Sequence, residues 1–170
     1  QVNSKVWLAE NLLEFVPVRP LNIVIYGGWN GVLASILFNS NINIQRITSV
    51  DIDPVCEDIA NTVNRRYLDQ KKFSAITADM TTVTDESADV VINTSCEHIT
   101  QAEYDKWLNN QSNDATIVLQ SNNYFNLDEH IRCSTDLEDF VRMSNINPYL
   151  RKTLETLKYD RYMLIGKKNV

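Results

Sequence analysis

The stretch "NIVIYGGWNGVLA" (Asn22–Ala34) decides the fold, because it joins a buried strand to a helix through a glycine-rich loop. The β-branched run over residues 21–26 is typical of a buried strand, and the segment 31–39 has helical periodicity. Three of the four glycines of the chain lie within Gly27–Gly31. Glycines at such a turn let the backbone approach a ligand, with the helix N-terminus facing it. The stretch therefore predicts a ligand-binding α/β unit.

The rest of the chain repeats this alternation of apolar strands and short helices. Further strands are predicted at 45–53, 73–79, 88–95 and 115–122, after a helix over 3–15, and residues 153–168 resemble two strands with a tight turn near Asp160. Short helices between strands imply right-handed crossovers and a sheet covered on both faces. We therefore predict a doubly wound, mostly parallel seven-stranded α/β sheet with a C-terminal antiparallel hairpin. Residues 1–170 are expected to form one domain, in which 1–20 are the N-terminal helix and lead-in.

Three helix starts can be predicted from local signals. Asp53 can cap the helix that follows, with Pro54 at its first position, and we expect that helix to run to about Arg66. The sequences Thr100–Glu103 and Thr135–Glu138 each match a capping box, and the second is expected to open a helix to about Met143.

Composition narrows the class of protein. A chain of 170 residues with 44% hydrophobic residues is ordinary for a globular domain, and no apolar run approaches the roughly 20 residues of a membrane span. Three cysteines are an odd number for a disulfide framework, which favours a reducing, cytoplasmic setting. The net charge of −6 argues against broad, charge-driven nucleic-acid binding. The basic stretches at 64–72 and 151–152 are interpreted as solvated faces.

Asp51 is the strongest single candidate for a ligand contact. It stands twenty residues after Gly31, at the end of the second predicted strand. In a doubly wound sheet that end lies beside the glycine loop, where a carboxylate can accept both hydroxyls of a ribose. Asp53 is the better helix cap by position, which leaves Asp51 free for a ligand. No Gly-Lys-Ser/Thr follows the glycines, so a P-loop is not indicated, and an NAD site would be expected to have a glycine at position 29 or 30.

Four motifs in order, "NIVIYGGWNGVLA", "ITSVDIDP", "ITADM" and "ADVVINTSCEHI", together resemble those of class I S-adenosylmethionine (SAM)-dependent methyltransferases. The resemblance covers nearly the whole chain, including the C-terminal hairpin. The pair "GGW" and "NTSCEH" is also similar to small methyltransferase-like sequences of phage and marine origin. The resemblance implies the Rossmann-like methyltransferase fold, SAM as cofactor and methyl transfer as the reaction.

The resemblance also implies roles for particular residues. The glycine loop would hold the methionine part of SAM, Asp51 the ribose and Asp79 the adenine amine, with Ile52 and Met80 on either side of the adenine ring. The full predicted cofactor set is Tyr26, Gly27, Gly28, Trp29, Asn30, Gly31, Asp51, Ile52, Asp79, Met80 and Asn93. Two positions depart from the family pattern: Trp29 replaces the middle glycine, and Ile25 replaces an acid.

The two histidines of the chain, His98 and His130, lie in the same tripeptide, Glu-His-Ile. Each tripeptide follows a predicted strand, and ligands bind beyond the carboxyl ends of strands in such sheets, so we expect both to face one cleft. Methyl transfer to a protonated acceptor requires a base, and a histidine suits that role. We predict that His98 is the base, with Glu97 orienting it or binding a substrate cation. The predicted substrate contacts are Ser95, Cys96, Asn123, Glu129 and His130.

Metal binding is a competing hypothesis for the same segments. Cys96 and His98, with His130 and Cys133, offer two thiols and two imidazoles, a set that zinc accepts. The one-residue spacing in the first pair is tighter than usual, so no metal is expected. A divalent ion held by Glu97, His98, Glu129 and His130 is the other form of this alternative.

The acceptor is expected to be a small molecule. An amino-methylating nucleic-acid enzyme would carry an N/D/S-P-P-Y/F motif after the fourth strand, and a 5-cytosine enzyme a Pro-Cys pair, whereas this chain has "NTSC". Cys96 is therefore interpreted as a buried residue rather than a nucleophile. A catalytically inactive, partner-binding domain on the same fold and a nucleic-acid methyltransferase stay as alternatives.

Overall fold

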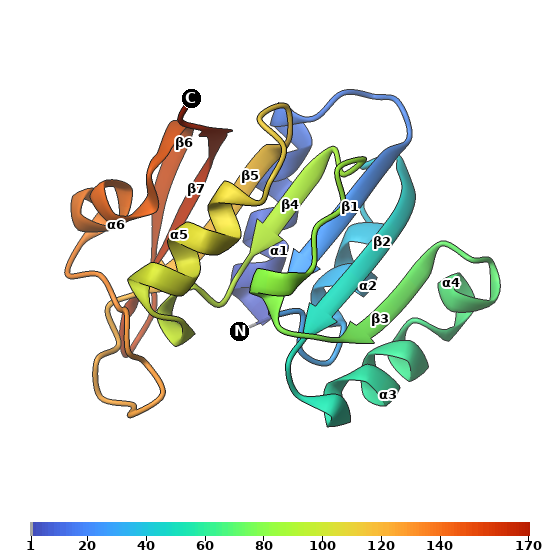
Figure 1. Cartoon of the computed structure of the whole chain (residues 1–170), viewed down its shortest axis with the longest axis horizontal. Helices are drawn as coiled ribbons and strands as arrows, with labels where there is room; N and C mark the ends of the chain where they lie inside the picture. Colours follow the sequence, from blue (N-terminus) through green and yellow to red (C-terminus); the bar gives the residue numbers. More distant parts are fainter. Residues whose placement is uncertain (1) are drawn as a thin grey trace.

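The computed structural model describes residues 2–170, which form one seven-stranded sheet in the order β3-β2-β1-β4-β5-β7-β6 (Figure 1). The strands are β1 Leu21–Tyr26, β2 Ile44–Asp51, β3 Phe73–Thr77, β4 Val90–Asn93, β5 Thr116–Asn122, β6 Ile146–Glu155 and β7 Asp160–Lys168. Strands β1 to β5 pair in parallel, and β7 runs antiparallel between β5 and β6. The predicted fold class, a mostly parallel sheet with a C-terminal antiparallel hairpin, is confirmed.

Helices cover both faces of this sheet. They are α1 Val2–Leu12, α2 Val32–Phe38, α3 Pro54–Val63, α4 Arg65–Asp69, α5 Gln101–Asn109 and α6 Leu137–Ser144, with 3-10 turns η1 Leu13–Phe15, η2 Met80–Thr82 and η3 Cys96–His98. In Figure 1, α5 crosses in front of the sheet while α1 and α2 lie behind it. Across residues 2–170, no helix combines the length and the apolar character that crossing a membrane requires.

Two hydrophobic cores form because successive strand residues point to opposite faces. Ile23 and Ile25 of β1 pack in the core beneath α1 and α2, whereas Val24 and Tyr26 pack in the core beneath α5 and α6. Complete burial of one such aliphatic side chain contributes about 1.5 to 3 kcal/mol. The continuous apolar run that predicted β1 is thus explained by burial on both faces.

The structure corrects three local predictions. The helix that begins at Pro54 stops at Val63, because the side chain of Asn64 donates hydrogen bonds to the carbonyls of Gly31 and Ala60, and a separate helix α4 follows. The second predicted capping box, Thr135–Glu138, is wrong. Asp136, not Thr135, is the N-cap, and its side chain accepts the N–H of Asp139 at 2.8 Å.

The third correction concerns β6, which begins at Ile146 rather than near residue 153, with the turn over residues 156–159. By contrast, the cap by Asp53 and the capping box of Thr100 and Glu103 are confirmed. This cap and this capping box stand at helices whose starts are set by their own sequence, whereas β6 is an outer strand with alternating exposure.

Candidate active site at the carboxyl edge of the sheet

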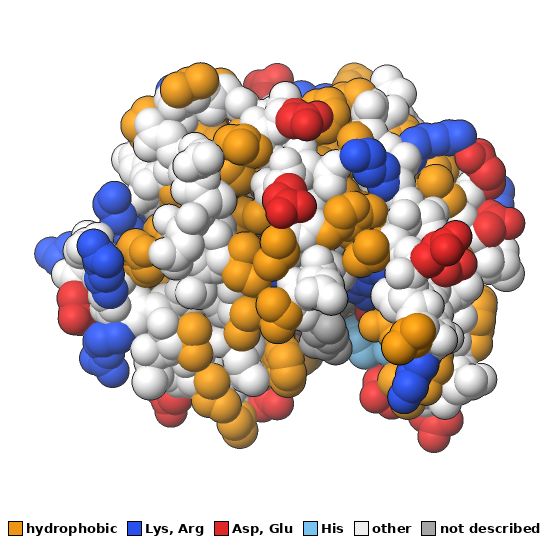
Figure 2. All heavy atoms as spheres, turned by 180° about the vertical axis from the view of Figure 1, so that it is seen from behind, with side chains coloured by type: hydrophobic (Ala, Val, Ile, Leu, Met, Phe, Trp, Pro, Cys, Tyr) orange, Lys and Arg blue, Asp and Glu red, His pale blue; other side chains and the backbone are white. Residues whose placement is uncertain are grey.

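A cavity of about 740 Å³ opens where the parallel strands end. Seen from behind, the molecule is notched at its lower edge, and a histidine side chain is visible in that notch (Figure 2). The predicted site residues that line the cavity are Gly27, Gly28, Trp29, Asp51, Ile52, Asp79, Met80, Ser95, Glu97, His98, Glu129 and His130. Residues from both predicted sites, cofactor and substrate, therefore share one cavity.

The glycine loop is packed too tightly for side chains. Gly27 has a φ of 68°, and a Cβ there would lie 2.2 Å from Oγ of Ser95. A Cβ on Gly28 would lie 1.9 Å from Oγ of Ser49. The N–H groups of both glycines donate to the carbonyl of Val50, at 2.8 and 3.1 Å. The loop backbone is thereby held against β2 and lines the cavity directly.

Asp51 is anchored at both carboxylate oxygens rather than free. Oδ2 accepts the backbone N–H of Trp29 at 2.9 Å, and Oδ1 accepts that of Asp53 at 3.0 Å. Each carboxylate oxygen has two lone pairs, so one on each is still available to a ligand in the cavity. Trp29 has a φ of 49°. This residue therefore adopts, at the middle of the loop, the left-handed backbone conformation that glycine favours.

Each of the two aspartates that line the cavity is followed in the sequence by an apolar residue that also lines it. Ile52, which follows β2, is 72% exposed, and Met80 begins η2. Asp79 accepts hydrogen bonds from the backbone N–H and the hydroxyl of Thr81, which lower its pKa and keep it ionised. An exposed apolar side chain beside an ionised carboxylate suits a flat, amine-bearing ring.

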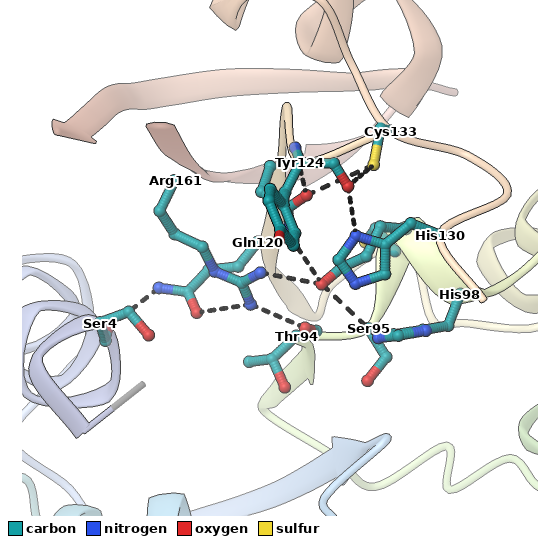
Figure 3. A network of polar contacts seen from close by, with 12 residues as sticks. Ser4, Thr94, Ser95, His98, Gln120, Tyr124, His130, Cys133 and Arg161 are labelled. Atoms are coloured by element: carbon teal, nitrogen blue, oxygen red, sulfur yellow. Dashed lines mark hydrogen bonds and ion pairs between the residues drawn. The ribbon is translucent and has the colours of Figure 1, made fainter. Parts of the chain in front are cut away.

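The opposite end of the cavity is polar and is organised by a buried ion pair (Figure 3). Oε1 of Glu97 accepts hydrogen bonds from Nη1 of Arg161 at 2.9 Å and from the amide of Asn122 at 3.0 Å. Arg161 also donates to the carbonyl of Thr94 at 2.8 Å. Oε2 of Glu97 is buried and makes no hydrogen bond within the described chain. Glu97 is thus fixed in place with one oxygen still unsatisfied.

Both histidines are oriented by backbone carbonyls. Nδ1 of His98 lies 3.1 Å from the carbonyl of Glu129, and Nδ1 of His130 lies 2.6 Å from that of Tyr124. A carbonyl oxygen can only accept, so a neutral ring carries its proton on Nδ1 and a lone pair on Nε2. The two rings are 4.8 Å apart at 81°, and Nε2 of His98 lies 3.8 Å from Oε1 of Glu97. Both Glu-His pairs meet in this one cavity.

The remaining predicted site residues, Tyr26, Asn30, Gly31, Asn93, Cys96 and Asn123, do not line the cavity. Tyr26 is buried, which raises its pKa to about 12, and its hydroxyl donates to the carbonyl of Val83. Burial likewise raises the pKa of Cys96 to about 12, as expected of a buried thiol rather than a nucleophile. Oδ1 of Asn93 accepts the N–H of Ser95, and Oδ1 of Asn123 accepts that of Asp160. Asn93 and Asn123 thus hold the backbone of Ser95 and of Asp160, both through hydrogen bonds.

Sequence reasoning missed Lys5, Asn122, Tyr124, Tyr159 and Arg161, which all line the cavity. Lys5 comes from α1, and its pKa is lowered first by burial and then by the nearby charge of Arg161. Asn122 was the one residue with a local signal, since it ends a predicted strand. Lys5, Tyr159 and Arg161 depend on how α1 and β7 pack against the sheet, and Tyr124 depends on the course of the segment that follows β5.

No protein-family model and no curated protein sequence matches the chain. Solved structures do: magnesium protoporphyrin IX methyltransferase of Synechocystis PCC 6803 with bound SAH has a TM-score of 0.77 at 12% identity, over 99% of this chain and 83% of that one. Geranyl diphosphate methyltransferase in complex with SAM gives 0.72 at 9%, over 96% and 85%.

A third similar structure is the pyocyanin biosynthetic protein PhzM, with a TM-score of 0.71 at 14% identity over 96% of this chain. The chain spans 55% of the length of PhzM. At such low identities these likenesses concern the fold, and the described chain has the Rossmann-like fold of these methyltransferases.

Proposed function

We propose that this protein is a SAM-dependent methyltransferase that acts on a small-molecule acceptor. The observation that carries the proposal is the position of Asp51. Its carboxylate holds the glycine loop and lines the cavity, and each oxygen keeps one lone pair that a ligand can use. The same carboxylate position follows the second strand in nucleotide-binding sheets and accepts ribose hydroxyls.

The cofactor would occupy the half of the cavity bounded by β1, β2 and β3. Asp51 would accept the ribose hydroxyls and Asp79 the adenine amine, with Ile52 and Met80 against the ring. The methionine part would then lie along Gly27 and Gly28, where no side chain blocks the backbone. This arrangement would place the sulfonium beside the polar half of the cavity.

The acceptor would occupy that polar half, beside the two imidazoles. Methyl transfer forms a bond from the acceptor atom to the methyl carbon while the carbon–sulfur bond breaks, so the acceptor must lie in line with that bond. The Nε2 lone pair of His98 faces the cavity and can take the proton of the acceptor. Glu97, 3.8 Å away and held by Arg161 and Asn122, would stabilise the imidazolium that forms. The carbonyl of Glu129, rather than Glu97, orients the His98 ring.

Ligand-induced stabilisation tests the proposal. Thermal unfolding would be followed with SAM, SAH and NAD added separately to the whole chain. An adenosyl ligand at a hundred times its dissociation constant should stabilise the fold by about 2.7 kcal/mol. A shift with NAD and none with SAM or SAH would contradict the proposal.

A further inference from the structure

We infer that the polar end of the cavity is a binding site for a divalent transition-metal ion, held by Glu97, His98 and His130. Each side chain offers one ligand atom, and these atoms all lie within 4.8 Å of one another. The inference goes beyond the proposed methyl transfer, which requires no metal, and metal binding itself does not depend on that proposal.

Both imidazole rings already have the tautomer and the orientation that a metal ligand needs. A histidine ligand commonly donates its other ring N–H to a backbone carbonyl or carboxylate, which fixes the tautomer and the ring orientation. His98 and His130 both do so through Nδ1, to Glu129 and Tyr124 respectively. Their Nε2 lone pairs are therefore the atoms available to an ion, and the two rings lie 4.8 Å apart between centroids.

The unsatisfied oxygen of Glu97 is an independent observation that points to a cation. The Glu97 side chain is 5% exposed, and Oε2 has no hydrogen-bond partner within the described chain. A buried carboxylate oxygen without a partner destabilises the fold, because its hydration is lost without replacement. Oε1, in contrast, is held by Arg161 and Asn122, which is the support that a ligating carboxylate usually has. Oε1 is the oxygen that lies 3.8 Å from Nε2 of His98, so an ion bound by both oxygens of the carboxylate would meet the imidazole and would also satisfy Oε2.

The charges of the cavity decide which kind of ion fits. Arg161 already balances Glu97, and Lys5 lies near both, so a hard ion such as Mg²⁺ or Ca²⁺ would meet too few anionic oxygens. Imidazole nitrogens bind zinc, iron, cobalt or nickel without needing extra negative charge. Two histidines and one carboxylate leave coordination positions open toward the rest of the cavity.

The ligand set differs from the four-residue zinc site considered from the sequence. Sγ of Cys96 lies 3.5 Å from the carbonyl of Asn93, and Sγ of Cys133 contacts Asn122 and the carbonyl of Tyr124. Within residues 2–170, the grouping of potential ligands at this cavity contains neither thiol. Tetrahedral ligands about 2.1 Å from zinc stand about 3.4 Å apart, so the three side chains must close slightly around an ion. His98, with a side chain 41% exposed, has room to do so.

The ion would supply chemistry to the proposed reaction, and this part rests on the proposed function. A hydroxyl bound to a divalent metal loses its proton to water more readily. The resulting oxygen forms its bond to the methyl carbon as the carbon–sulfur bond breaks, and sulfur leaves as a neutral thioether. In the metal-loaded protein the Nε2 lone pair of His98 would bind the ion and would no longer accept the proton. The ion would instead lower the pKa of the acceptor hydroxyl, and water would take the proton. Hydroxyl-bearing small molecules are the acceptor class that fits.

Cobalt binding tests the site directly. Protein without a histidine tag would be stripped with a chelator and titrated with CoCl₂, followed by visible absorption and by calorimetry. We expect one equivalent of Co²⁺ to bind. His130→Ala, Glu97→Gln and the more conservative His130→Gln should each weaken binding at least about tenfold, the effect typical of losses around a metal. Circular dichroism would verify that each variant is folded.

Asp51→Ala is the matched control in the other half of the cavity. It should keep the Co²⁺ affinity and lose SAH affinity, whereas His130→Ala should do the reverse. No Co²⁺ binding to the wild-type chain, or equal binding to folded His130→Ala and His130→Gln, would overturn the metal site. Co²⁺ binding that depends on His130, in a wild-type chain that does not bind SAH, would uphold the metal site and reject the proposed function.

Discussion

The backbone N–H of Trp29 donates a 2.9 Å hydrogen bond to Oδ2 of Asp51. This contact joins the glycine loop to the end of β2, and Oδ1 of the same carboxylate joins β2 to the start of α3 through Asp53. The Asp51 side chain therefore shapes the loop and also lines the cavity. Substitution of Asp51 is expected to affect ligand binding in two ways at once.

Asp51→Ala should weaken SAH binding by about 10- to 100-fold, because a hydrogen bond to a charged group is worth about 1.5 to 3 kcal/mol. Calorimetric titration with SAH measures the change. His98→Ala serves as the control and should bind SAH nearly as the wild type does. A comparable loss in the histidine variant would place His98 on the cofactor side.

Alanine variants of Gly27 and Gly28 should differ in how much stability a second substitution restores. Gly28→Ala brings its new Cβ within 1.9 Å of Oγ of Ser49, so it should destabilise the fold by about 1 to 3 kcal/mol. Adding Ser49→Ala should restore part of that loss. Gly27→Ala meets Ser95 in the same way but also has a φ of 68°, so Ser95→Ala should restore less. Urea unfolding of the single and double variants checks this, and equal rescue at both positions would contradict the backbone argument.

Arg161→Met should be strongly destabilising. It leaves the Glu97 carboxylate buried without its cation, and the loss of one partner of a buried pair costs about 3 to 5 kcal/mol. Arg151→Met is the control, since Arg151 pairs with Glu138 on the surface and both side chains are largely exposed. Urea unfolding should separate the two variants clearly. Equal effects would mean that the Glu97–Arg161 pair does not support the fold.

Acid should destabilise the protein through three aspartates. Hydrogen bonds from the backbone of Thr81, the side chain of Arg19 and the backbone of Thr135 lower the pKa of Asp79, Asp89 and Asp139, respectively. The folded state then binds these protons less tightly than the unfolded chain, whose aspartates titrate near about pH 3.9. Their stabilisation is present above that pH and is lost as pH falls through the lowered pKa values.

Asp139→Asn should accordingly make the fall of unfolding free energy below about pH 4 less steep. Urea unfolding at a series of acidic pH values measures the slope. Asp58→Asn is the control, because Asp58 is exposed on α3 and its carboxylate makes no hydrogen bond within the described chain. An unchanged slope in Asp139→Asn would show that Asp139 does not contribute.

Local signals were sufficient for the parts of the site that lie close together in the sequence. The glycine loop, Asp51 and Asp79 each follow a strand whose apolar run is visible in the sequence. Both aspartates line the cavity, as do residues 27–29 of the loop. The N-cap of α6 was predicted one residue too early, because Thr135 and Asp136 are both good caps and an acid stands three residues after each. The hydroxyl of Tyr162 contacts the carbonyl of Thr135, a long-range contact that the local sequence does not contain.

Arg161 was missed because its place depends on strand pairing. Register brings it opposite Asn122 across the antiparallel β5–β7 pair, next to Glu97. Lys5 was missed for a similar reason: α1 reaches the sheet through Ser4, whose carbonyl accepts the amide of Gln120, 116 residues away. The first seven residues of the outer strand β6 were not predicted, because the strand is exposed on alternate residues and contains Pro148.

The segment between β5 and α6, residues 123–136, supplies Tyr124, Leu127, Glu129 and His130 to one wall of the cavity. The opposite wall comes from the loops after β1, β2 and β3, which the sheet holds in place. One wall is thus built on strand ends that the sheet holds in place, and the other on the single segment that connects β5 to α6. Under the proposed function, replacement of residues 125–129 is expected to change which acceptor the cavity binds while the Asp51 half of the cavity stays as it is.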